Sequence, residues 1–325
     1  MVPAGGTRQG RGHETDVTFR SSRLTLAGTL FLPGAPTAGR LPAVVIGHSG
    51  GGVKEQTASV YAERLAREGF AALVFDAAHQ GESEGEPRGL ENPFQRAEDI
   101  KSAVSFLVTR DGIDPDRIGA VGICASGGYV PYAAQTDVRI KAVATVSAVD
   151  LGSVMRDGPG PARDPQALRS MLERASAART AEARGEPVPR QEWITEAVDA
   201  ETREYYRTAR GHHPRAVQPW PVRSLDQIIQ YDSYALIHLI SPRPLLMIVG
   251  SEADTAHFSR DAIEKAAEPK ELFVIDGGTH VSLYDRDEHV TPAVAKVTAF
   301  LTAHLRHGAP RVPQRQGSST SKSFR

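Results

Sequence analysis

Cysteine is almost absent from this sequence: Cys124 is the only one among 325 residues. A single cysteine excludes an internal disulfide framework and any zinc or iron–sulfur site built from several thiolates. Cysteine is also a small apolar side chain that buries easily. Cys124 lies between a short apolar run and a glycine-rich turn, in the segment RIGAVGICASGGY. The sequence around Cys124 must therefore show whether its role is packing or chemistry.

Long apolar runs and clusters of one charge are also missing. The longest apolar runs, such as PLLMIVG, are too short to cross a bilayer, and the segment MVPAGGTRQGRGHETD lacks the apolar core of a secretory signal. The formal net charge is −1, from 38 basic and 39 acidic residues, so nothing global favours nucleic acid or an acidic membrane surface as a partner. With 40% hydrophobic residues, the composition is that of a globular protein, and we expect a cytoplasmic enzyme.

Strand and helix patterns alternate in two parts of the chain, 14–150 and 241–307. An opening hairpin is predicted in DVTFRSSRLTLAGTLFLP, and further strands in the segments LPAVVIGHSGGG, AALVFDAAHQGES, RIGAVGIC, IKAVATVSAVD, PRPLLMIVGSEAD and ELFVIDGGTH, several of which end in a loop. Segments with helical spacing separate most of these runs. Repeated strand–helix units predict an α/β fold with a mostly parallel central sheet and helices on both faces.

The alternation stops between residues 151 and 240. Charged, alanine-rich stretches there predict a helical cap, inserted after the sixth strand and lying over the strand ends. Its aromatic residues are candidates either for the lining of a pocket or for the core of the cap itself: Trp193, Tyr205, Tyr206 and Trp220. Residues 1–13 and 308–325 are rich in Gly, Pro, Ser and Arg, which predicts disorder at both ends.

Cys124 falls at the carboxyl end of a predicted strand, where parallel sheets place their reactive groups. Gly122-Ile123-Cys124-Ala125-Ser126 follows the G-x-nucleophile-x-small pattern of a strand–turn–helix elbow. The small residues at its ends let the strand and the helix approach each other. A competing register makes Ser126 the nucleophile, in Cys-Ala-Ser-Gly-Gly, but it lengthens the strand by two residues. The lead-in RIGAVG favours Cys124.

A base and an acid for this nucleophile are found farther along the chain. His280 follows the glycine-rich turn of DGGTH, after the last predicted strand. The order nucleophile, acid, histidine is that of the elbow motif. We predict Asp254 as the acid, at the end of the preceding strand, with Glu252 as the alternative. The carboxylate would hold the imidazole tautomer and stabilise the imidazolium.

The loop GHSGGG, residues 47–52, follows a predicted strand, as the loops that form oxyanion holes do. The backbone N–H of Ser49 or Gly50, together with that of Ala125, is predicted to hold the oxyanion. His48 is expected to brace the loop. Neither G-x-x-x-x-G-K-[ST] nor G-x-G-x-x-G occurs, so the glycines do not indicate a nucleotide site.

Further residues are candidates for contacts with substrate or for support of the catalytic groups. His79 lies in the turn-rich loop DAAHQGES, where it either orders the loop or contacts substrate. Glu55 either influences protonation of the thiolate or only stabilises the start of a helix. The remaining candidates of this kind are Ser126, Tyr129, Trp193 and Trp220.

Four segments, GHSGGG, DAAHQGES, GICASGG and GSEAD with GGTH, together resemble the α/β-hydrolase superfamily over most of residues 15–305. The cysteine nucleophile resembles that of the dienelactone hydrolases. This resemblance implies an enzyme without cofactor or metal that acts on esters, lactones or thioesters. Two departures stand out: Asp254 lies four residues after Gly250 rather than about three, and compact dienelactone hydrolases have no counterpart of residues 151–240.

The main hypothesis is therefore a hydrolase with a Cys124–His280–Asp254 triad and a thioester acyl-enzyme. The thiolate would be stabilised by His280 and by the helix that starts after Cys124. One alternative is an acyltransferase or cyclase that uses the same triad on a biosynthetic, polyketide-like acyl intermediate bound to a carrier or to CoA. The other is a binding protein on a hydrolase fold. The sequence leaves open whether the protein forms a homodimer.

Overall fold

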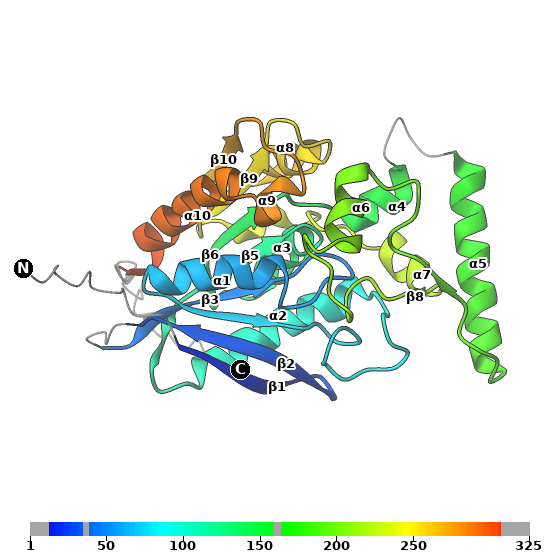
Figure 1. The fold of residues 1–325 in the computed structure, drawn as a ribbon, viewed down its shortest axis with the longest axis horizontal. Coiled ribbons are helices and arrows are strands. Elements are labelled where there is room, and N and C mark those ends of the chain that lie inside the picture. The colour runs from blue at the N-terminus through cyan, green and yellow to red at the C-terminus, as the bar shows by residue number, and fades with distance from the viewer. Residues whose placement is uncertain (1–12, 35–38, 159–163, 307–325) are drawn as a thin grey trace, which may run out of the picture.

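The computed structural model describes residues 13–34, 39–158 and 164–306. An eight-stranded sheet lies at the centre of these residues, in the order β1-β2-β4-β3-β5-β6-β9-β10 (Figure 1). The six strands from β4 to β10 are parallel to one another, and the β1–β2 hairpin at the edge is antiparallel. The predicted α/β-hydrolase fold is confirmed. The termini predicted to be disordered lie outside the described residues, except for His13, which begins β1.

The strands lie where the apolar runs of the sequence predict them. Most of the inner strands are buried on both faces, which is why their sequences are nearly continuous apolar runs rather than alternating ones. The bounds are β1 His13–Ser21, β2 Leu24–Leu32, β3 Leu41–Gly47, β4 Ala71–Phe75, β5 Ile113–Ile123, β6 Ile140–Val146, β9 Leu245–Gly250 and β10 Lys270–Ile275.

Helices cover both faces of the sheet. Neighbouring residues of β3 point into the two cores on opposite faces of the sheet. Val45 packs into the core formed with α2 and α3, and Val44 packs into the core formed with α1 and α10. The helix bounds are α1 Thr57–Arg67, α2 Pro93–Val108, α3 Ser126–Thr136, α8 Ala256–Lys265, α9 Ser282–Asp285 and α10 Asp287–Leu301, the last followed by the short π-helix η2, Thr302–Arg306. No helix in the described ranges combines the length and hydropathy needed to cross a membrane.

Local sequence signals explain several of these helix ends. The side chain of Asn92 accepts hydrogen bonds from the N–H groups of Phe94 and Gln95, and Pro93 occupies the first position of α2. Helix α1 ends at Arg67, and Gly69 follows it with φ +94°. Helix α10 begins at Asp287 and includes Pro292.

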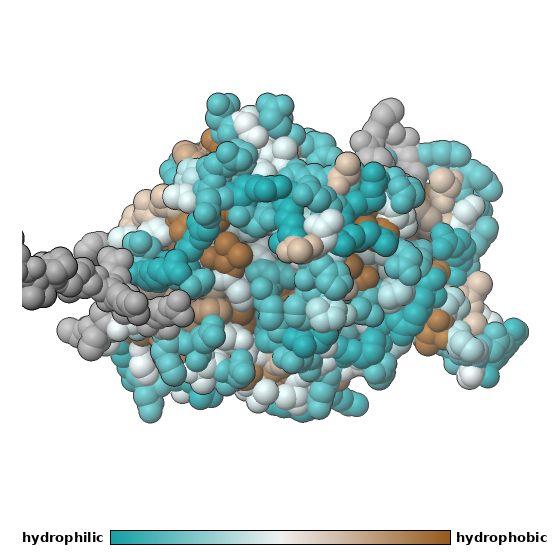
Figure 2. Space-filling view, in the orientation of Figure 1, coloured by the Kyte–Doolittle hydropathy of each residue, from teal (hydrophilic) through white to brown (hydrophobic). Residues whose placement is uncertain are grey.

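Residues 151–240 connect β6 to β9, two strands that pair directly with each other. Figure 1 shows their helices gathered at one end of the sheet, with α5 farthest from it. Figure 2 shows a mostly hydrophilic surface on this side, with small separated apolar areas. The bounds are α4 Leu151–Asp157, α5 Pro165–Ala183, β7 Arg190–Gln191, α6 Ala200–Arg207, β8 Trp220–Pro221, α7 Ser224–Ile229 and η1 Ile237–Ile240.

Candidate active site

Cys124 occupies a tight turn between β5 and α3. Its φ angle is +56°, in the left-handed region that residues other than glycine rarely adopt. The backbone around it is held on both sides, because its N–H donates to the carbonyl of Val146 at 3.0 Å and its carbonyl accepts from Gly127 at 2.8 Å and Val149 at 3.0 Å. Such strain persists only where the surroundings fix it, and it is concentrated at functional sites.

The residues at the two ends of the elbow pattern have steric and bonding roles. A Cβ added to Gly122 would lie within 3.0 Å of the backbone carbonyl of Ser126, so only glycine fits there. Ser126 is buried at the first position of α3, and its hydroxyl donates to the carbonyl of His48 at 2.5 Å. The side chain that the competing register makes the nucleophile therefore ties α3 to the loop after β3.

Three groups surround the partly buried thiol of Cys124: the imidazole of His280, the hydroxyl of Tyr284 and the backbone N–H of Gly50. Burial raises the pKa of the thiol, but the charge of His280 and hydrogen bonds from these three groups outweigh it, so that the pKa lies below its ordinary value. Burial lowers the pKa of His280, and the thiolate outweighs that effect and raises it. The geometry thus favours a thiolate–imidazolium pair.

His280 follows β10, and its backbone is held by the hydroxyl of Ser147, which donates to its carbonyl at 3.0 Å. Its Nε2 lies 2.9 Å from the hydroxyl of Tyr284. Its Nδ1 lies 2.6 Å from the hydroxyl of Thr255. The imidazole is therefore oriented by one hydroxyl on each side.

Neither of the two carboxylates considered as the triad acid is hydrogen-bonded to Nδ1 of this imidazole. Asp254 is exposed; its charge raises the pKa of His280, and its backbone carbonyl accepts from His257 at 2.9 Å. Glu252 is also exposed and accepts from the hydroxyl of Ser251 at 3.3 Å. Thr255, the neighbour of Asp254, makes the hydrogen bond that was predicted for a carboxylate.

The loop after β3 brings backbone donors to the thiol. The N–H of Gly50 is hydrogen-bonded to Cys124 itself. The hydroxyl of Ser49 lies 2.6 Å from that of Tyr206, a residue of α6 in the inserted segment. Ala125 precedes the first residue of α3, with helical backbone angles, so its N–H belongs to the amino-terminal end of that helix. Two of the three candidate donors, Gly50 and Ala125, thus lie next to Cys124.

His48 braces this loop from behind. Its Nδ1 donates to the carbonyl of Ser49 at 2.8 Å, and its Nε2 accepts from the N–H of Ala77 at 3.1 Å and from Arg96 at 3.0 Å. Burial first, and then the charge of Arg96, holds the pKa of His48 well below its usual range. A neutral imidazole with one fixed tautomer satisfies all three bonds, as the bracing role expected for His48 requires.

Arg96 belongs to a buried polar cluster under the loop. Its guanidinium lies 3.3 Å from the carboxylate of Glu91 and 5.0 Å from the centre of the Tyr129 ring. The hydroxyl of Tyr129 donates to Glu91 at 2.7 Å. Tyr129, a candidate for substrate contact in the sequence, is thus engaged in supporting the loop from the interior.

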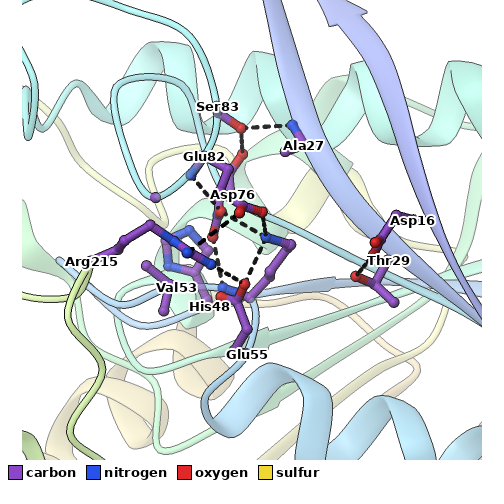
Figure 3. A network of polar contacts seen from close by, with 12 residues as sticks. Asp16, Ala27, Thr29, His48, Val53, Glu55, Asp76, Glu82, Ser83 and Arg215 are labelled. Carbon is purple, nitrogen blue, oxygen red and sulfur yellow. Dashed lines mark hydrogen bonds and ion pairs between the residues drawn. The ribbon is translucent and has the colours of Figure 1, made fainter.

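A second ionic cluster holds the far end of the loop (Figure 3). The ammonium of Lys54 lies 2.8 Å from Glu55, 3.1 Å from Asp76 and 2.6 Å from Glu82. The three carboxylates are close enough together to bind a cation, and the lysine ammonium supplies one. Arg215 of the inserted segment also pairs with Glu55 and Glu82. Glu55 therefore links the core to the inserted segment.

Two tryptophans of the inserted segment stack on each other beside the loop. The rings of Trp193 and Trp220 are 5.0 Å apart and nearly parallel. A Cβ on Gly51, whose φ is +63°, would lie 2.8 Å from the indole nitrogen of Trp193. Trp193 also packs against the same core clusters as Cys124, whereas Trp220 is buried within one of them. Trp193 thus covers the loop next to the thiol.

His79 lies in the loop after β4, and hydrogen bonds of its backbone hold it in place. Its N–H donates to Glu84 at 2.9 Å, and its carbonyl accepts from Gly89 at 2.7 Å. Burial lowers the pKa of its imidazole. These contacts favour the loop-ordering role among the two considered for His79.

Sequence reasoning missed Tyr284, Thr255 and Arg96. Tyr284 lies four residues after His280, a spacing that brings side chains together in a helical turn. Thr255 is adjacent to the predicted acid. Both positions were therefore near a recognised motif, whereas Arg96 lies in a helix away from every motif and reaches His48 from a distant part of the chain.

The hydrogen bond between Thr255 and Nδ1 of His280 leads to a prediction about the acid of the triad. Thr255→Val removes a direct bond and should lower kcat by about tenfold, the loss of one hydrogen bond to a charged group. Asp254→Asn removes a charge that raises the pKa of His280 and should lower kcat by a similar factor of about ten. Steady-state kinetics on an acyl substrate measure this. Glu252→Gln is the matched control and should keep the parent rate; a larger loss there would make Glu252 the acid.

Comparison with known proteins places this site in a family. A model described as "Dienelactone hydrolase family" matches residues 26–149. The uncharacterized protein YcjY of Escherichia coli is 41% identical over 274 residues, which cover 81% of this chain and 89% of YcjY. The crystal structure of the hypothetical protein PA2218 from Pseudomonas aeruginosa has a TM-score of 0.86 and 35% identity, and the match covers 91% of this chain and 94% of that one.

A more distant relative has a named activity. Acyltransferase drtE of Aspergillus calidoustus is 25% identical over 306 residues, which cover 90% of this chain and 95% of drtE. This match therefore includes the inserted segment as well as the sheet. From the family model and the extent of the YcjY and PA2218 matches, the chain belongs to the dienelactone hydrolase family of α/β-hydrolases.

Proposed function

We propose that this protein is a cofactor-independent hydrolase that cleaves an ester, lactone or thioester through Cys124, His280 and Asp254. One observation carries the proposal: Cys124 occupies the elbow at φ +56° with its thiol hydrogen-bonded to His280. A buried structural cysteine needs neither a strained backbone nor an ionised partner. The family relationship supports hydrolytic chemistry at this position.

The proposed reaction has two halves. His280 takes the proton of the Cys124 thiol, and the thiolate attacks the substrate carbonyl carbon. Backbone N–H groups of Gly50 or Ser49 and of Ala125 hold the oxyanion. The tetrahedral intermediate then expels an alcohol or thiol, which takes its proton from His280 and leaves a thioester on Cys124. Water loses a proton to His280 and attacks this thioester, and the acid departs as the thiol is restored.

We further propose that residues 151–240 act as a cap over this site. The N–H of Val217 donates to the carbonyl of Gly51 at 2.6 Å, and the side chain of Gln56 donates to the carbonyl of Gly211 at 2.6 Å. Together with the ion pairs of Arg215, these contacts hold the segment against the oxyanion loop. Trp193 would then form one wall of the substrate pocket.

A second candidate function is acyl transfer or ring closure by the same residues. The relative drtE, an acyltransferase that aligns with nearly the whole chain, favours it. In this case an amine, alcohol or carbon nucleophile replaces water in the second half of the reaction. A carrier-bound or CoA-bound acyl group would be a suitable donor, because its thioester exchanges with the Cys124 thiolate at little cost in bond energy.

Intact-protein mass spectrometry tests the proposal. The parent protein, Cys124→Ala and Ser126→Ala are each incubated with a panel of activated esters and thioesters. We expect an acyl adduct on the parent and on Ser126→Ala, and none on Cys124→Ala. Addition of an amine or alcohol nucleophile then distinguishes hydrolysis from transfer by the product formed.

The opposite results have definite meanings. Acylation lost only in Ser126→Ala would make the protein a serine hydrolase and the competing register correct. No adduct and no turnover in any variant, with ligand binding unchanged by Cys124→Ala, would favour the binding-protein hypothesis instead.

A further inference from the structure

We propose that Tyr284 is a catalytic residue: its hydroxyl donates to the Cys124 thiolate and stabilises the ion pair that this thiolate forms with His280. This inference rests on the proposed function, since it assumes that Cys124 is the nucleophile. Tyr206 extends the hydrogen-bonded network to Ser49, so the inserted segment contributes a hydroxyl to the site.

Four groups form one hydrogen-bonded network: the thiol of Cys124 and the hydroxyls of Tyr284, Tyr206 and Ser49. The hydroxyl of Tyr284 lies 2.9 Å from Nε2 of His280 and also contacts the thiol of Cys124. The hydroxyl of Tyr206 is hydrogen-bonded to Tyr284 and lies 2.6 Å from the hydroxyl of Ser49. Both tyrosines are buried, so water does not compete freely for these bonds.

A hydroxyl has one hydrogen to donate and two lone pairs that accept. In the ion-pair state, Nε2–H of His280 is shared by the thiolate and the oxygen of Tyr284, which also accepts from the hydroxyl of Tyr206. The hydroxyl of Tyr206 in turn accepts from Ser49. Every hydrogen of the network is then donated, and in this arrangement Tyr284 is a donor to sulfur.

The proton transfer needs no additional reactant. The S–H proton of Cys124 passes directly to Nε2 of His280, its hydrogen-bond partner, which produces a thiolate and an imidazolium. Tyr284 keeps its own proton throughout and donates it in a hydrogen bond to the sulfur once the sulfur is an anion. Burial, and next the Cys124 charge, raises the pKa of Tyr284 well above its usual range, which is compatible with a hydroxyl that stays protonated overall.

Other titratable groups face this site from each neighbouring element. Tyr205 of α6 packs edge-on against Tyr284, with ring centres 5.2 Å apart. The carboxylates of Asp254 and Asp199 act on His280 through charge. Asp285, beside Tyr284 in sequence, acts on Tyr205 and pairs with Arg210. None of these groups is altered by removal of the Tyr284 hydroxyl, so a change in thiol ionisation can be traced to that hydroxyl.

Alkylation of Cys124 by iodoacetamide between pH 5 and 10, followed by intact mass, measures the effect. Because the chain has one cysteine, each thiol adduct lies on Cys124. Tyr284→Phe keeps the ring but loses a donor to the thiolate, so the thiol pKa should rise and alkylation near pH 7 should slow by about tenfold. Near pH 10 both thiols are ionised and the two rates should be similar.

Tyr205→Phe is the matched control, because it removes a hydroxyl from a neighbouring buried ring that does not contact sulfur. It should follow the parent profile. Tyr206→Phe should shift the profile in the same direction as Tyr284→Phe but less, since Tyr206 reaches sulfur only through Tyr284. Thermal denaturation establishes that each variant is folded, and Tyr206→Phe carries the test if Tyr284→Phe does not fold.

The outcomes separate this proposal from the proposed function. A parent thiol with the alkylation profile of an ordinary free thiol, and no acyl adduct, would overturn the proposed function and the role of Tyr284 with it. A reactive parent whose profile is unchanged in Tyr284→Phe and Tyr206→Phe would overturn the role of Tyr284 alone. Equal slowing at all pH values would also overturn it, since that result reports access to the thiol rather than its ionisation.

Discussion

Replacing Cys124 or His280 by alanine should each lower kcat by about 10⁴-fold or more, and replacing both should cost no more than either single change. The reason is that the thiol and the imidazole act as one unit: a thiolate without its base, or a base without its nucleophile, does no covalent chemistry. Residual turnover would come from the backbone donors and from substrate binding, which both variants retain. Steady-state kinetics on the substrate that gives the acyl adduct measure the three variants.

His238→Ala provides the control for this experiment. His238 is exposed on η1, away from the groups around the thiol, and its replacement should leave kcat unchanged. If the losses in the double variant instead equal the product of the single losses, the two residues act independently. Such additivity would contradict a Cys124–His280 unit.

The contacts that define this site differ in how far the sequence could predict them. The elbow could be predicted because Gly122, Cys124 and Ser126 lie within five residues and their steric requirements are local. The approximate positions of His280 and Asp254 could be predicted because parallel strands bring their carboxyl ends to one edge. Position at that edge does not determine hydrogen-bond partners, so the Nδ1 contact of Thr255 was not predicted.

The polar residues that support the loop after β3 could not be predicted in the same way. His48 follows β3, Arg96 belongs to α2 and Glu91 precedes α2, and each residue type is common in surface positions. Their burial is favourable only because each polar atom finds a partner in the folded chain. A single sequence contains no local pattern that shows which buried polar atoms will be hydrogen-bonded to one another. The bracing role of His48 was therefore predicted only from its place in the loop.

The inserted segment was predicted as helical from its composition, and its contacts were not. The stacked pair of Trp193 and Trp220 depends on the antiparallel pairing of β7 with β8, in which Gln191 lies opposite Trp220. Each of these strands is only two residues long, too short for the periodicity that identifies a strand. The aromatic residues were recognised as candidates for a pocket, but their position against Gly51 required the fold.

Gly122→Ala should destabilise the protein by about 3 kcal/mol or more, because the new methyl group meets backbone rather than a flexible side chain. Its Cβ would lie within 3.0 Å of both the carbonyl of Ser126 and the N–H of Gly127, so either β5 or α3 must move. That movement also displaces Cys124 from the groups that lower the pKa of its thiol. The rate of alkylation by iodoacetamide near neutral pH should therefore fall toward that of an ordinary thiol. The midpoint of thermal unfolding and the alkylation profile measure the two effects.

Gly112→Ala is the matched control, since Gly112 immediately precedes the same strand and a Cβ there would meet no atom within 4 Å. Its φ is not in the left-handed region, so alanine should change the stability by less than about 1 kcal/mol. Both changes add one methyl group at one end of β5, and only one of them crowds the elbow. Equal unfolding midpoints for the two variants would mean that the strand and the helix can separate without cost. The close approach at Gly122 would then not be what holds Cys124 in its strained conformation.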